Sequence, residues 1–335
     1  MKISWTAPLL LYGEPATISS SLETRFGLSF SPTTIIASRF NATGSIELQS
    51  FPVSASYQEY YQEAVEKDHA LSDDFDEARV KSIFESNIIP INTSLTEQLD
   101  HTPEFATLFT PSIFDWKTIL AAGEAVFKDA QYMTRAAPSR QAACYGFGFL
   151  QCRNLGRSLS ECNDHDPESL VLLFEYEKEY LYVWLVWVSF ELEVHSAEHE
   201  KICKDCGEEF REAIGEAAYQ ERINKFVQDF LVQHVLPEHK REHIRAIIIA
   251  GEASAAAVKE LGDAALEVVG TEEVKLLTDF EPSEVVAHGA AVFSRLTQEH
   301  PEHFGTTTGN IIPDDKEWAE MQARIERENE GHSEL

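Results

Sequence analysis

Two histidines and two cysteines in the stretch HSAEHEKICKDC are the residues best suited to metal chemistry. His195, His199, Cys203 and Cys206 fall within twelve residues, and imidazole and thiolate groups are common ligands of zinc. In a helix all four would lie near one face, but one straight helix cannot surround a metal tetrahedrally. A zinc site would therefore need a kink or a second element. The simpler interpretation, which the sequence favours, is a solvated linker between two elements.

A second unusual stretch is LLFEYEKEYLYVW, which covers residues 172–184. Its two apolar runs predict a β-hairpin. The turn between them carries Glu177, Lys178 and Glu179, where tight hairpins usually place glycine or asparagine. An acidic, bulky tip therefore needs an explanation beyond turn formation.

Composition limits the classes of partner. The chain of 335 residues has 27 Lys+Arg and 57 Asp+Glu, a formal net charge of −30, which disfavours binding to nucleic acids and anionic membranes. The longest apolar run, residues 180–190, is shorter than the ~20 residues of a membrane-spanning helix. The first residues do not fit a signal peptide, and five cysteines suit a reducing compartment. We therefore expect a cytoplasmic protein with no membrane span.

Strand and helix patterns alternate along the chain. Strands are expected within 25–49, 105–114, 170–194 and 245–251. Helices are expected at 57–84, 115–131, 138–150 and 208–233, after residue 251, and from 282 onward. A polar loop should span 151–168. This order predicts an α/β fold with mixed sheets in two lobes.

Several of these segments resemble the ATPase domain of the heat-shock chaperones of the seventy-kilodalton class, and so the actin-like ATPase superfamily. The similar stretches are FTPSIF (109–114), PSRQAACYGFGF (138–149), IGEAAYQERI (214–223), IIIAGEASAAAVKEL (247–261) and FEPSEVVAHGAAV (280–292). The order of these stretches is also similar to that in divergent chaperone-like proteins of filamentous fungi.

The resemblance covers roughly residues 25–296 and implies an actin-like (ribonuclease H-like) two-lobed fold. It implies an N-terminal segment at 1–24, lobe I at 25–150, lobe II at 151–296 with a linking helix at 282–296 that returns to lobe I, and an acidic helical tail at 297–335. Tyr145, Gly146, His288 and Gly289 would lie on the two helices that link the lobes.

The nucleotide-binding turns depart from the family pattern. At the second phosphate loop, Glu175 replaces an aspartate, and Glu177, Lys178 and Glu179 replace glycines that let backbone N–H groups approach phosphates. At the first loop Gly27 and Thr33 match, but Ser29 replaces the aspartate that holds the metal-bound water, and Ser31 replaces a glycine. Gly251 remains at the adenosine loop, where Glu252 replaces a glycine. The subdomain that clamps the adenine is also missing, because only residues 224–245 stand in its place.

These departures predict a pseudo-ATPase that binds neither ATP nor magnesium and needs no cofactor. Such a protein would act by binding a protein partner, in an interaction or regulatory role. One alternative is an enzyme whose freed cleft acts on a small organic ligand, by cyclisation or isomerisation in secondary metabolism. The other is a weak chaperone-like ATPase.

Overall fold

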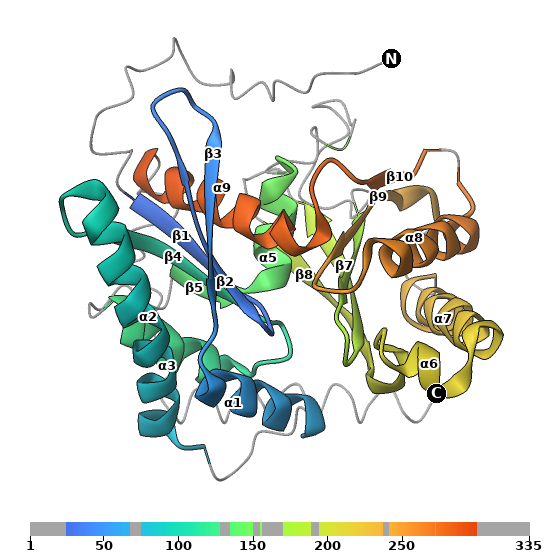
Figure 1. The fold of residues 1–335 in the computed structure, drawn as a ribbon. Coiled ribbons are helices and arrows are strands. Elements are labelled where there is room, and N and C mark those ends of the chain that lie inside the picture. The colour runs from blue at the N-terminus through green and yellow to red at the C-terminus, as the bar shows by residue number, and fades with distance from the viewer. Residues whose placement is uncertain are drawn as a thin grey trace, which may run out of the picture.

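The computed structural model describes residues 25–67, 75–127, 135–149, 155, 170–188, 194–236, 241–271 and 273–299. Its strands form two five-stranded mixed sheets, with helices packed around and between them (Figure 1). The predicted α/β class with mixed sheets is therefore confirmed. None of the described helices combines the length and the apolar character that crossing a membrane requires.

The first sheet and its covering helices are built from residues 25–138. Its strands are β1 (Arg25–Phe30), β2 (Thr34–Phe40), β3 (Ile46–Pro52), β4 (Glu104–Thr110) and β5 (Ala136–Pro138). The helices are α1 (Ala55–Glu66), α2 (Glu77–Leu99) and α3 (Trp116–Phe127). Polar caps fix where two of them begin, because Ser54 and Asp76 accept hydrogen bonds from the backbone N–H groups of Tyr57 and Arg79.

The second sheet follows with its own helices. Its strands are β6 (Leu170–Tyr176), β7 (Leu181–Val188), β8 (Val194–Cys203), β9 (Ile244–Ala250) and β10 (Lys275–Leu277). The helices are α6 (Phe210–Ile214), α7 (Glu216–Phe230) and α8 (Ala255–Val269). Shorter helical turns are η3 (Lys204–Cys206), η4 (Leu231–Val235), η5 (Arg241–His243) and η6 (Pro282–Glu284).

The two sheets have the same topology. The strand order is β3-β2-β1-β4-β5 in the first and β8-β7-β6-β9-β10 in the second, read in the matching direction. In each sheet the first strand pairs antiparallel with the second and parallel with the fourth. The second and third strands pair antiparallel, and the fourth and fifth pair parallel. The same arrangement of five strands therefore occurs twice in the chain.

Helices α5 (Ser139–Gly146) and α9 (Val285–Glu299) lie between the sheets and pack against each other (Figure 1). They cross at glycines: a Cβ on Gly289 would lie 2.9 Å from Cα of Ala142 and closer still to its carbonyl group. A Cβ on Gly146 would lie 2.9 Å from the carbonyl oxygen of Val285. Two backbones that approach this closely leave no room for side chains at the crossing.

Apolar side chains fill two cores. One extends from α1, α2 and α3 through the first sheet to the second sheet and includes Phe84, Ala290 and Trp184, and the other lies between the second sheet, α7 and α8. Strand β6 serves both, since Val171 and Leu173 belong to the first core while Leu172 and Phe174 belong to the second. Burial on both faces explains why the hairpin reads as two nearly continuous apolar runs.

Several sequence-based boundaries need correction. The helix expected at 57–84 is two helices, and the second runs on to Leu99. The helix expected at 208–233 is broken by Gly215, whose φ of +82° an L side chain rarely adopts. The N-terminal segment, all of the polar loop at 151–168 except residue 155, and the tail at 300–335 lie outside the described residues.

Candidate functional site

The acidic hairpin tip is buried rather than displayed. Glu175 lies at the end of β6 and Glu177 begins the turn, and each side chain is only 3% exposed. The backbone N–H of Glu177 donates to the carbonyl of Tyr180 at 2.9 Å and closes the turn. Lys178 is exposed at the tip, and Glu179 accepts a hydrogen bond from Gln62 of α1 at 3.1 Å. The tip therefore packs against the first half of the chain.

Glu175 connects the two halves through its carboxylate. The backbone N–H of Ser112, in the turn after β4, donates to both carboxylate oxygens at 3.1 and 3.2 Å. The hydroxyls of Ser139, at the start of α5, and Tyr180 also donate to it. A buried carboxylate requires such donors, so this residue is a structural joint between the two sheets.

Glu252 binds the turn between β1 and β2. Its carboxylate accepts hydrogen bonds from the Ser31 hydroxyl, from the Thr33 hydroxyl at 2.6 Å and from the Thr33 backbone N–H at 3.3 Å. Its own N–H donates to Glu177 at 2.8 Å. Three turns that are far apart in the sequence therefore meet, and an anionic side chain lies at their centre.

Gly251 allows this meeting. Its φ is +125°, and a Cβ there would lie 2.8 Å from the carbonyl carbon of Tyr176. Its N–H donates to the carbonyl of Pro282, and the N–H of Ala253, two residues on, donates to the carbonyl of Tyr176. Only glycine tolerates this conformation and this contact, so Gly251 has a clear structural role.

Two residues predicted for the first phosphate loop lie elsewhere. Gly27 is within β1, where a Cβ would lie 2.8 Å from Cβ of Ala290 in α9. Ser29 is buried in the same strand, with Ile36 and Phe109 as its neighbours on β2 and β4. Gly27 therefore serves packing between β1 and α9, while Ser31 and Thr33 form the turn that meets Glu252.

Burial dominates the electrostatics of this site. Burial, followed by the neighbouring charge of Glu175, raises the pKa of Glu177 well above its usual range, and the hydrogen bond from the Glu252 N–H partly opposes this. Burial also raises the pKa of Tyr57, Tyr61 and Tyr180, and nearby carboxylates add to it.

The tyrosines on α1 were not predicted as part of the site. Tyr57 and Tyr61 lie four residues apart, on one face of α1, and both are buried. The ring of Tyr61 lies 6.4 Å from that of Tyr180. The helical spacing could have revealed a buried face, but nothing in the sequence relates that face to Glu175 and Glu177. Ser112 and Ser139 were missed for the same reason.

The four residues predicted for the linking helices do lie on α5 and α9. Gly146 and Gly289 form the crossing described above. Tyr145 packs on Phe293 with ring centroids 5.0 Å apart, and His288 stacks on Phe280 at 4.0 Å. Burial lowers the pKa of His288, so its side chain favours the neutral form in this contact.

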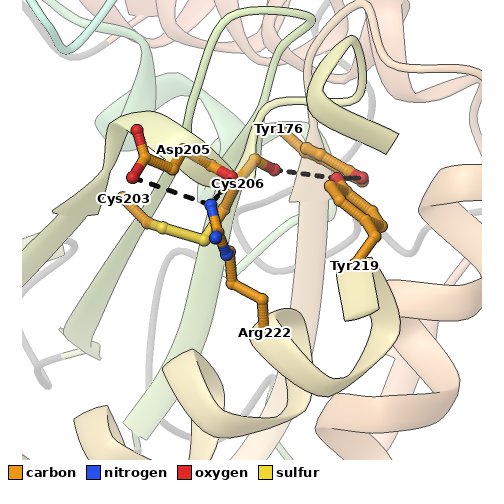
Figure 2. The surroundings of a disulfide bond; sticks show 6 residues. All are labelled: Tyr176, Cys203, Asp205, Cys206, Tyr219 and Arg222. Carbon is orange, nitrogen blue, oxygen red and sulfur yellow. Dashed lines mark hydrogen bonds and ion pairs between the residues drawn. A yellow bond between two sulfur atoms is a disulfide. The ribbon is translucent and has the colours of Figure 1, made fainter. Parts of the chain in front are cut away.

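The stretch with His195 and His199 is neither a helix nor a linker. It is strand β8, in which the backbone of His195 pairs with Trp187 and that of Cys203 with Leu181. Cys203 and Cys206 form a disulfide (Figure 2), which corrects the expectation of unpaired thiols. A disulfide sulfur lacks the thiolate that binds zinc. Among the described residues, no group of three or more potential ligands is placed to hold a metal ion.

No protein-family model and no curated protein matches this chain.

Proposed function

We propose that this chain has an actin-like fold whose nucleotide site has been lost, and that it acts as an interaction or regulatory protein. Two features support the fold. The topology of the first sheet recurs in the second, and two helices that cross at glycines lie between the sheets. Paired mixed sheets with two linking helices are what the resemblance to the actin-like ATPases implies.

The observation that carries the loss of nucleotide binding is the position of the Glu252 carboxylate. In the resembled family, the turn that corresponds to residues 31–33 offers hydrogen-bond donors to phosphate. Here Ser31 and Thr33 donate to Glu252 instead. A carboxylate is an anion that accepts charge-assisted hydrogen bonds, as a phosphate does. The side chain therefore takes the place of the ligand.

The second turn opposes a phosphate as well. Glu177 accepts the Glu252 N–H, so that amide is no longer available. Glu175, at the position of the family's aspartate, is fully engaged by Ser112, Ser139 and Tyr180. A phosphate at this position would find these hydrogen-bond donors already occupied by carboxylates. The negative charge of the carboxylates would also repel it. The closed arrangement suits a protein that keeps one shape for a partner instead of cycling with a nucleotide.

The test is a calorimetric titration of the full chain with magnesium and ATP, together with thermal unfolding. A ligand at one hundred times its dissociation constant stabilises the folded state by about 2.7 kcal/mol, so micromolar binding would be detected at millimolar ATP. We expect no heat and no change in melting temperature. Magnesium-dependent hydrolysis that is lost in Gly251→Val would overturn the proposal.

The matched variants are Glu252→Gln and Glu252→Ala. Glutamine keeps the acceptor oxygen but not the charge, whereas alanine frees the donors of Ser31 and Thr33. If the carboxylate stabilises the joined turns, alanine should destabilise the chain more than glutamine does. Equal stability for wild type and both variants would show that Glu252 does not hold the turns together.

A further inference from the structure

The disulfide between Cys203 and Cys206 lies where β8 ends, next to the hairpin tip. Its two cysteine residues differ in exposure: Cys206 is fully buried, whereas Cys203 is partly exposed. Two residues separate the cysteines, which is the spacing of many thiol–disulfide exchange motifs. The first cysteine of the pair is therefore the one that an external thiol can reach.

A bond that closes so short a loop is poorly suited to stabilising a fold. The stabilisation from a disulfide grows with the length of the closed loop, and here the loop holds only Lys204 and Asp205 between the cysteines. The surrounding β8 strand is already held by its pairing with β7. A role in redox chemistry therefore accounts for this disulfide better than a role in stabilising the fold.

A cation lies beside the bond. The guanidinium of Arg222, from α7, reaches alongside the disulfide (Figure 2), donating to the Asp205 carbonyl at 3.1 Å and lying 3.6 Å from the Asp205 carboxylate. A nearby positive charge favours a thiolate, and a more stable thiolate is a better leaving group. Arg222 is thus placed to promote release of one sulfur from the bond.

The turn that contains the disulfide holds the hairpin tip. A Cβ on Gly207 would lie 2.5 Å from the backbone nitrogen of Tyr180. The N–H groups of Glu208 and Glu209 donate to the carbonyls of Glu177 and Lys178 at 3.2 and 3.1 Å. The first residue after the disulfide therefore packs directly on the tip, and the next two bind its backbone.

The same turn reaches two further elements. Lys204 donates to the carbonyls of Glu66 and Lys67, at the end of α1, at 3.2 and 3.0 Å. Glu208 accepts the backbone N–H of Ser254, the residue that caps α8, at 2.7 Å. Breaking the disulfide could therefore alter the contacts that this turn makes with both halves of the chain.

We propose that Cys203 and Cys206 form a reversible thiol–disulfide exchange site, reduced by a small thiol or a protein dithiol, whose state sets how tightly residues 207–209 hold the hairpin tip. This proposal does not depend on the loss of nucleotide binding. The thiolate of the reductant attacks Sγ of Cys203, the bond to Cys206 breaks, and Cys206 leaves as a thiolate. A second thiolate attacks the external sulfur of the mixed disulfide and releases Cys203. Two external thiols are oxidised to one disulfide, and the pair gains two electrons and two protons.

The first experiment equilibrates the folded full-length chain with glutathione buffers of graded ratio, followed by alkylation and peptide mass spectrometry. We expect the pair to change between oxidised and reduced forms while the chain stays folded. Cys144 is the internal control, because it is buried and burial raises its pKa to about 12, so its alkylation reports unfolding. A pair that stays oxidised in excess dithiothreitol until Cys144 also reacts would overturn the proposal.

Single variants test the direction of attack. With oxidised glutathione, Cys206→Ser should form a mixed disulfide on Cys203, and Cys203→Ser should react at least tenfold more slowly at Cys206. Arg222→Gln should slow reduction by dithiothreitol several-fold, whereas Arg222→Lys, which keeps the charge, should retain most of the rate. Faster reaction at Cys206, or equal rates for the two Arg222 variants, would refute this mechanism.

Hydrogen exchange tests the consequence for the hairpin tip. In the reduced chain the amides of Glu208 and Glu209 should exchange at least several-fold faster than in the oxidised chain. Amides in the centre of β1 provide the control and should not change. Identical exchange at residues 208 and 209 in the two states would show that the bond does not control this contact.

Discussion

Replacing Gly289 with alanine tests whether the two linking helices need their close approach. A Cβ at this position would lie 2.9 Å from Cα of Ala142 and closer still to its carbonyl group. These are backbone atoms of α5, which cannot rotate away as a side chain can. The helices would have to separate locally by more than about 1 Å to restore ordinary contacts of about 3.5 Å with the carbonyl group.

Two opposing terms set the size of the effect. Overpacking a well-filled core typically costs about 1–3 kcal/mol, and contact with backbone places Gly289→Ala at the upper end. Alanine regains about 1 kcal/mol over glycine within a helix. We therefore expect the free energy of unfolding to fall by about 2 kcal/mol. In domains somewhat smaller than this chain, each kcal/mol of lost stability lowers the melting temperature by about 2–4 °C. The melting temperature should therefore fall by roughly 4–8 °C.

Gly262→Ala in α8 is the matched control. It is also a buried helical glycine, and its Cβ would lie 2.6 Å from Cδ2 of Leu276. That atom ends a flexible, half-buried side chain that can move. Urea unfolding, with melting temperature as a second readout, should place Gly262→Ala within about 1 kcal/mol of wild type. If Gly289→Ala is no less stable than Gly262→Ala, the two helices do not cross as described.

Two further predictions concern Glu177 and Ser254. Because Glu177 has a raised pKa in the folded chain, its contribution to stability is complete below about pH 4.5 and is lost as the pH rises through the folded pKa. Glu177→Gln should therefore gain stability relative to wild type between pH 4.5 and neutrality in urea unfolding, and a pH-independent difference would contradict the raised pKa. Ser254→Ala removes the cap of α8 and should lower the free energy of unfolding by about 1 kcal/mol. The exposed Ser283→Ala should change it by less than about 0.5 kcal/mol, and equal effects of the two alanine variants would argue against the cap.

The sequence predicted elements whose pattern is local. The strands at 25–49, the hairpin and the strand RAIIIAG were all found near their expected places, because apolar runs bounded by turn residues report burial directly. Helix boundaries were less accurate. Gly215 interrupts the helix expected at 208–233, and its effect depends on a φ angle that the residue type permits but does not require.

The stretch from His195 to Cys206 shows a different limit. Its spacing fits a helix or a linker, yet the chain forms β8 and pairs with β7. Strand formation by a polar, charged sequence at a sheet edge depends on the neighbouring strand, and β-propensity is more dependent on context than helix propensity. The disulfide follows from that placement, because two cysteines must be close before they can bond.

The sequence by itself determined the α/β class of the fold and the order of its elements other than β8, and it showed glutamates at the turns after β6 and β9. It could not determine what these glutamates contact. Only the tertiary structure places Glu252 on Ser31 and Thr33 and surrounds Glu175 with Ser112, Ser139 and Tyr180. The physical reason is that, except for the local bond from Tyr180, these hydrogen bonds join residues 36 to 221 positions apart. Such contacts form only after the sheets and linking helices have brought the turns together, and no local pattern encodes them.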